Sequence, residues 1–98
     1  VYTEKRIYVS EASAILHEFG HFLDYTMGFP QEHKDLYALE AASAPMKQHA
    51  KSNSLEYFAE FFSYWLSGST RMLAQLKELT PETYAYFEEL SADWIPLA

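Results

Sequence analysis

The stretch His17-Glu18-Phe19-Gly20-His21 places two histidines four residues apart, with a glutamate directly after the first. Residues four apart on a helix lie on the same face, so both imidazoles can point at one metal ion. Glu18 is offset from His17 by about 100° around the helix, which would place its carboxylate beside the metal as a base for water. This HExxH pattern predicts a zinc site.

The surrounding sequence predicts a helix from Ser10, which can cap it, to Met27, where Gly28-Phe29-Pro30 ends it. A broad apolar face is formed by Ala14, Ile15, Leu16, Phe19, Phe22 and Leu23. A polar line with i, i+3, i+4, i+7 spacing is formed by His17, Gly20, His21 and Asp24. Gly20 costs about 1 kcal/mol of helix propensity relative to Ala, which suggests a close approach to the backbone there. The alternative is a helix whose His and Glu simply face solvent.

Catalytic zinc takes three protein ligands and leaves one position to water, so a third ligand is required. A helix is predicted over Ser54–Ser67, where Asn53 and Glu56 form a capping-box-like start. On this largely aromatic helix, a polar stripe is formed by Glu56, Glu60, Ser63 and Ser67. An inward-facing carboxylate needs a partner, and a metal with two imidazoles would be one. We expect Glu56 to be the ligand and Glu60 to accept a hydrogen bond from a ligand histidine, although spacing leaves the reverse open. A solvent-exposed stripe is the other interpretation.

The rest of the chain predicts one mainly α domain over residues 1–98, an α+β zincin core with one short strand at its edge. Arg6–Val9 alternate polar and apolar residues and form the expected strand. The HExxH helix is expected to pack with the glutamate-bearing helix and two C-terminal helices. The other segments are a helix over Gln31–Ser43, a loop over Pro45–Ser54, a helix over Arg71–Leu79, and a last helix capped by Thr80 and running towards Trp94.

The composition excludes several classes of binding partner and of metal ligand. The formal net charge is -7, with 14 acidic and 7 basic residues and no basic cluster, so nucleic acid and anionic membranes are poor partners. Cysteine is absent, so any metal must be held by nitrogen and oxygen. No segment approaches the ~20 apolar residues of a membrane span. Val1 is not an initiator Met, so we expect part of a longer protein with any targeting signal upstream.

Asp24 and His33 are two further polar residues outside the expected ligand set. Asp24 either orients His21 or faces water. His33 stands in the charged stretch Gln31-Glu32-His33-Lys34-Asp35, which indicates an ordinary surface histidine.

Three segments together carry a family resemblance. They are HEFGH with the following Phe22-Leu23-Asp24-Tyr25, the stretch Asn53-Ser54-Leu55-Glu56-Tyr57-Phe58-Ala59-Glu60-Phe61-Phe62, and Thr80-Pro81-Glu82-Thr83-Tyr84-Ala85-Tyr86-Phe87. From about Ile7 onward the chain resembles the catalytic domain of the anthrax lethal factor-like zinc peptidases, which include the secreted bacterial Pro-Pro endopeptidases.

The resemblance implies zinc ligands at His17, His21 and Glu56, a general base at Glu18 and a supporting carboxylate at Glu60. The family places a Tyr seven residues before the glutamate ligand, where it stabilises the transition state. This chain has His49 at that position, and its imidazole could stabilise an oxyanion instead. Tyr37 is the other candidate, and a loop histidine without a role is the third interpretation. The family also has more sheet before the HExxH helix, and the Arg6–Val9 strand would be the edge that binds an extended peptide.

The sequence therefore predicts a secreted or extracellular, monomeric zinc endopeptidase that hydrolyses peptide bonds of a protein or peptide substrate with zinc-activated water. A competing hypothesis is a catalytically silent, zincin-like module that only binds a partner. A purely structural helical domain is a third, and it predicts no stoichiometric zinc.

Overall fold

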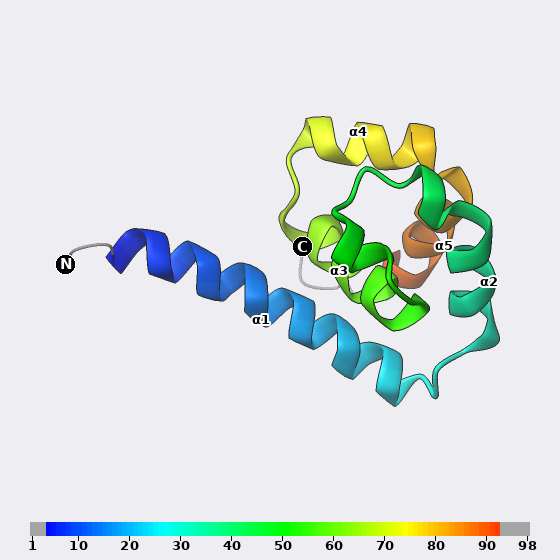
Figure 1. The fold of residues 1–98 in the computed structure, drawn as a ribbon, viewed down its shortest axis with the longest axis horizontal. Helices are drawn as coiled ribbons and strands as arrows, with labels where there is room; N and C mark the ends of the chain where they lie inside the picture. The colour runs from blue at the N-terminus through cyan, green and yellow to red at the C-terminus, as the bar shows by residue number, and fades with distance from the viewer. Residues whose placement is uncertain (1–3, 93–98) are drawn as a thin grey trace.

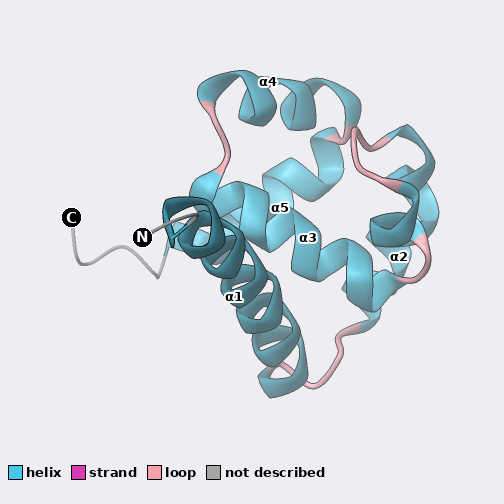
Figure 2. Ribbon diagram, turned by 60° about the vertical axis from the view of Figure 1, so that its left-hand side comes forward, coloured by secondary structure: helices cyan, strands magenta, loops and turns pink. Residues whose placement is uncertain are grey.

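The computed structural model describes residues 4–92, with side chains from residue 14 onward, and this part consists of helices and connecting loops (Figure 1, Figure 2). The order is α1 (Glu4–Thr26), α2 (Gln31–Glu40), the 3₁₀ turns η1 (Ala41–Ser43) and η2 (Gln48–Lys51), α3 (Ser54–Ser67), α4 (Thr70–Leu79) and α5 (Pro81–Ser91). The mainly α expectation is confirmed. Over residues 4–92, no helix combines the length and the apolar character that crossing a membrane requires.

Helix α3 lies at the centre, with α1 along one side and α2, α4 and α5 around the rest (Figure 1). It is the most apolar helix, and its buried residues Tyr57, Phe58, Phe61 and Phe62 form most of the core. The Phe61 ring stacks on Phe87 of α5 with centroids 4.7 Å apart. Burial of aromatic surface on both sides of α3 therefore holds the other helices in place.

The ends of α1 and α3 follow their local sequence. Asn53 caps α3, since its side-chain oxygen accepts a hydrogen bond from the Glu56 backbone N–H at 2.9 Å, as predicted. Helix α1 ends in a Schellman turn, in which the Phe29 N–H donates to the Asp24 carbonyl and the Gly28 N–H to the Tyr25 carbonyl. Gly28 has a φ of 81°, a conformation that glycine adopts without strain. Both bounds of α3 are thus confirmed, and α1 ends at Thr26, one residue before the predicted Met27.

The predicted N-terminal strand is wrong. The structure places Arg6–Val9 inside α1, and Ser10, expected to cap the helix, lies within it as well. A four-residue alternation is short evidence for a strand, and a strand needs a neighbour to satisfy its backbone hydrogen bonds. No second strand exists over residues 4–92, whereas a helix satisfies these groups within itself. The edge strand and the peptide-binding role given to it are therefore withdrawn.

The C-terminal helices also differ from expectation in their connections. The element predicted over Gln31–Ser43 is an α-helix only to Glu40 and then tightens into η1. Thr80 precedes α5 but does not cap it, because its hydroxyl donates to the Leu76 carbonyl at 2.5 Å. Helix α5 ends at Ser91, and Trp94 lies outside the described residues.

Glu40 provides the cap that Thr80 does not. Its buried carboxylate accepts the backbone N–H of Glu82 at 2.9 Å and that of Thr83 at 2.8 Å, together with the Thr83 hydroxyl at 2.7 Å. A negative charge at a helix N-terminus is favourable because the backbone N–H groups there carry partial positive charge. The end of α2 is thereby joined to the start of α5.

Replacing Glu40 with Ala should lower the free energy of unfolding by about 2–4 kcal/mol, because buried donors of α5 lose a charged acceptor. Chemical denaturation monitored by circular dichroism measures the change. Glu78→Ala is the matched control, since Glu78 is exposed on α4, and it should stay within about 0.5 kcal/mol of wild type. Equal stability of the two variants would contradict the assigned role of Glu40.

Candidate metal centre

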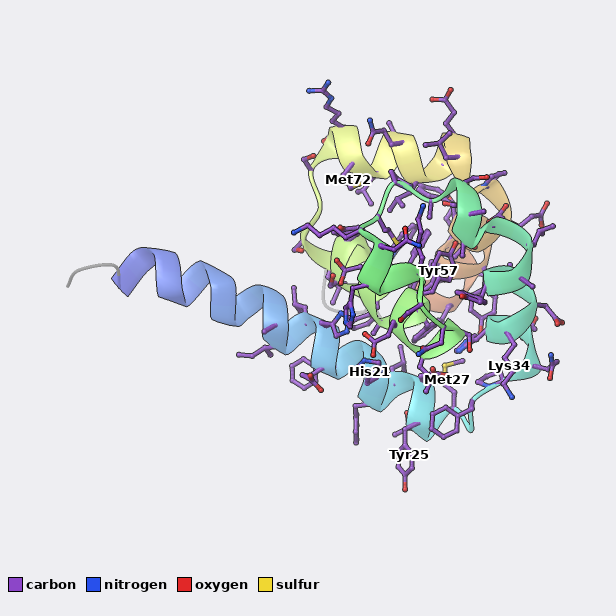
Figure 3. All side chains as sticks on the ribbon, in the orientation of Figure 1. His21, Tyr25, Met27, Lys34, Tyr57 and Met72 are labelled. Carbon is purple, nitrogen blue, oxygen red and sulfur yellow. The ribbon has the colours of Figure 1, made fainter. Side chains whose placement is uncertain are left out.

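The polar line of α1 faces α3 rather than solvent. Gly20 and Asp24 are buried, and the side chains of His17 and His21 are only 20% and 29% exposed. His21 lies on the side of α1 turned towards α3, whereas Tyr25 points away from the other helices (Figure 3). The interpretation of His17 and His21 as ordinary solvent-facing residues is therefore wrong. The two imidazoles lie edge to face with ring centroids 4.8 Å apart.

Gly20 makes this arrangement possible because α1 and α3 are in close contact there. A Cβ atom at position 20 would lie 2.6 Å from the Ala59 Cα and 2.9 Å from the Ala59 carbonyl oxygen, which is closer than nonbonded atoms approach. The helix-weakening glycine is thus explained by the backbone of α3, as the sequence suggested. This close contact brings the faces of α1 and α3 that carry the candidate ligands within reach of one another.

The Glu56 carboxylate contacts both histidines. Its Oε1 lies 2.9 Å from His17 Nε2, and its Oε2 lies 3.3 Å from His21 Nε2. One ligand atom from each of these three residues can be chosen so that all lie within 4.8 Å of one another. Glu56 is also in the first turn of α3, where the helix dipole favours a carboxylate.

Glu60 contacts the opposite edge of the first histidine. Its Oε1 lies 2.8 Å from His17 Nδ1. In the neutral tautomer that carries its proton on Nδ1, the ring donates a hydrogen bond to Glu60, and Nε2, 2.9 Å from Glu56 Oε1, is the nitrogen left to bind a metal. This geometry distinguishes the two carboxylates: Glu56 is on the side where the ligand atoms converge, and Glu60 orients a histidine from behind.

Tyr64 belongs to the same arrangement and was not anticipated from the sequence. Burial, the charge of Glu60 and a hydrogen bond to Glu60 raise the pKa of the Tyr64 hydroxyl to about 12. The phenol therefore keeps its proton and donates a hydrogen bond to Glu60. Tyr64 follows Glu60 by four residues on the same helix, and this spacing was the signal in the sequence. The signal was weak because the other aromatic residues of α3 are apolar.

His49 lies at the edge of the cluster, on η2. Its side chain is 80% exposed, and its Nε2 is 3.4 Å from Glu56 Oε1. Tyr37, the other candidate for stabilising an oxyanion, is directed elsewhere, because its hydroxyl donates to the Lys51 carbonyl at 2.6 Å. Tyr37 therefore anchors the turn that carries His49.

Glu18 follows His17 on an exposed face of α1. Its side chain is exposed and lines an open hollow together with Ala14, Ile15, Phe19 and Phe22. Only part of the apolar face predicted for α1 is covered, since Ile15, Phe19 and Phe22 are more than half exposed. The carboxylate of Glu18 is thus accessible from solvent on this part of α1.

Two sequence-based interpretations are corrected by one buried contact. His33, expected at the surface, is only 4% exposed, and its Nδ1 lies 2.8 Å from Asp24 Oδ1. Asp24 therefore neither faces water nor contacts His21 through this oxygen. The other ring nitrogen of His33 lies 2.7 Å from the Tyr86 hydroxyl. These partners are 9 and 53 residues away in the chain, so no local pattern indicated them.

The residues at this centre fit a zinc ion. Two imidazole nitrogens and one carboxylate are a ligand set found in catalytic zinc sites, which leave a fourth position open. The partial exposure of all three side chains is consistent with access from solvent. The carboxylate behind His17 is the kind of partner that fixes the tautomer of a ligand histidine.

Residues 2–90 match the family model described as anthrax toxin lethal factor, N- and C-terminal domain. Searches of curated proteins and of solved structures gave no match.

The stability of the protein should fall as the pH is lowered below about 6.5, because burial lowers the pKa of His33 from its ordinary value of 6.5. The unfolded chain then binds a proton that the folded protein excludes, and the loss is complete below the folded pKa. Unfolding free energies measured from pH 8 to pH 5 should decline in wild type with a contribution of up to about 1.4 kcal/mol per pH unit from His33.

His33→Phe should make this decline shallower, since it removes the titrating group and keeps an aromatic ring. An equally steep decline in the variant would show that other groups cause the pH dependence.

Proposed function

The chain belongs to the anthrax toxin lethal factor family, N- and C-terminal domain, and we propose that it is a zinc-dependent endopeptidase domain acting on a protein or peptide. The observation that carries the proposal is the convergence of His17, His21 and Glu56 on one point, with Glu60 behind His17. The HExxH order supplies both histidines and a carboxylate beside them from a single helix.

In this proposal His17 and His21 bind the metal through Nε2, and Glu56 binds it through its carboxylate. A zinc ion, when bound, supplies Lewis acidity that lowers the pKa of water and polarises a carbonyl. Glu60 holds the His17 proton on Nδ1, so that Nε2 remains available as a ligand. Tyr64 in turn holds Glu60 by donating a hydrogen bond to it.

Glu18 is the proposed general base. Its exposed carboxylate can accept a proton from the attacking water and then deliver it to the leaving amine. His49 is the proposed electrophile, because its exposed imidazole lies beside Glu56 and can donate an N–H to a developing oxyanion. Tyr37 supports this role by fixing η2 rather than by acting itself.

Glu18→Gln should leave zinc binding intact and lower the rate of peptide cleavage by about 10²–10⁴-fold, since the amide cannot accept the proton. Metal analysis of the purified protein and cleavage of a peptide library measure the two properties. Glu78→Gln, at an exposed site on α4, is the matched control and should change neither. Cleavage at the wild-type rate in Glu18→Gln would exclude this residue as the base.

Glu56→Gln and Glu60→Gln should separate the ligand from the residue that orients it. We expect Glu60→Gln to weaken zinc binding by about 10–100-fold and Glu56→Gln to weaken it more, because only the latter loses a ligand charge. Competition with a chromogenic chelator gives both affinities. The reverse order would make Glu60 the ligand, and a wild-type protein without stoichiometric zinc would support the purely structural helical domain instead.

A further inference from the structure

A second, buried polar network begins on α1 one turn beyond the metal centre. Asp24, three residues after His21 on α1, is 1% exposed and contacts His33 Nδ1 at 2.8 Å. His33 belongs to α2, and its Nε2 contacts the Tyr86 hydroxyl of α5 at 2.7 Å. One imidazole therefore connects three helices.

The same imidazole is also packed on the fourth helix. Its ring stacks on Phe58 of α3, with centroids 4.0 Å apart and an angle of 14° between the planes. Phe58 stands between Glu56 and Glu60 in the sequence. Asp24 is therefore close in sequence to His21, and Phe58 is close in sequence to Glu56 and Glu60. His33 contacts both Asp24 and Phe58.

We propose that Asp24, His33 and Tyr86 are positioning residues that fix α1 on α3 and thereby hold His17 and His21 opposite Glu56. This inference rests on the proposed zinc site for its functional consequence, although the helix contact itself can be tested without metal. The network acts through the helices, because none of its members contributes to the converging ligand atoms.

The protons of the network follow from its partners. The Asp24 carboxylate accepts a hydrogen bond from His33 Nδ1–H, so the neutral ring has its lone pair on Nε2 and accepts the Tyr86 O–H. Burial, followed by the charges of Glu32 and Asp24, raises the pKa of Tyr86 to about 12, so this hydroxyl stays protonated. Both hydrogen bonds of the ring therefore form with neutral His33, while the second oxygen of Asp24 is buried without a hydrogen-bond partner.

The surroundings of His33 favour the neutral ring on balance. Desolvation lowers its pKa, while the hydrogen bond and charge of Asp24 and the charge of Glu32 act in the opposite direction. The groups that face the ring are Asp24 from α1, Glu32 from α2, Tyr86 from α5 and the apolar Phe58 from α3. Protonation would turn Nε2 into a donor and displace the Tyr86 hydrogen from its present bond.

Three variants test the positioning role. Tyr86→Phe removes only the hydroxyl, His33→Phe keeps a ring on Phe58 but removes both hydrogen bonds, and Asp24→Asn keeps the shape but removes the charge. The matched control is Tyr84→Phe, because Tyr84 is also on α5 but packs on Trp65 outside the network. Circular dichroism first establishes that each variant is folded.

Two readouts are measured at pH 8, where histidine is neutral. The first is zinc affinity, determined by chelator competition with zinc alone, which should fall about tenfold in His33→Phe and several-fold in Tyr86→Phe and Asp24→Asn. The second is the nuclear Overhauser effect between the Gly20 α-protons and the Ala59 methyl group in metal-free protein, which should weaken in the same variants. Tyr84→Phe should match wild type in both.

The outcomes separate this inference from the proposed function. If wild type binds no zinc but the variants lose the Gly20–Ala59 signal, the metal centre is wrong and the positioning of α1 on α3 stands. Wild-type zinc affinity together with an unchanged Gly20–Ala59 signal in folded variants would overturn the positioning role. Loss of folding in all three variants would assign the network to global stability and would also overturn it, provided that Tyr84→Phe remains folded.

Discussion

The contact between Gly20 and Ala59 is the constraint on which the site depends. His17 and His21 lie three residues before and one residue after Gly20, and Glu56 and Glu60 have the same spacing around Ala59. Because no side chain separates the helices at position 20, the backbone of α3 approaches α1 directly. The flanking imidazoles and carboxylates then meet at hydrogen-bond distances. A larger residue at position 20 would separate the helices at the centre of this group.

Helix α1 is unusual because its polar face is turned inward. Burying polar groups is unfavourable unless they are hydrogen-bonded, and His17, His21 and Asp24 each contact a side chain of another element, although one oxygen of Asp24 is buried without a hydrogen-bond partner. Glu56 and Glu60 contact the histidines, while His33 contacts Asp24. Part of the apolar face, including Phe19 and Phe22, remains exposed instead. An inward polar face is more readily explained by a site than by stability alone, since an apolar stripe would pack with less desolvation cost.

Local sequence predicted the elements wherever one nearby signal sufficed. Asn53 caps α3 and the helix covers Ser54–Ser67 as expected, and the spacing of Glu56 and Glu60 predicted that both carboxylates lie on one face of it. Prediction failed where the partner was distant or absent. Arg6–Val9 alternated like a strand but had no described strand beside it, and the cap of α5 came from Glu40, about forty residues earlier. His33 stood in a charged stretch, yet its three partners come from other helices.

The sequence by itself determined the types of the candidate ligands, their order and the helical faces on which they lie, because helical periodicity fixes the relation between residues four apart. It left Glu56 and Glu60 exchangeable, since both occupy the same stripe. Only the tertiary structure distinguished them, by placing one carboxylate on each edge of the His17 ring. It likewise decided that Asp24 meets His33 and that Tyr37 anchors the turn bearing His49. These contacts depend on how the helices cross, and helix crossing is set by packing that no single segment contains.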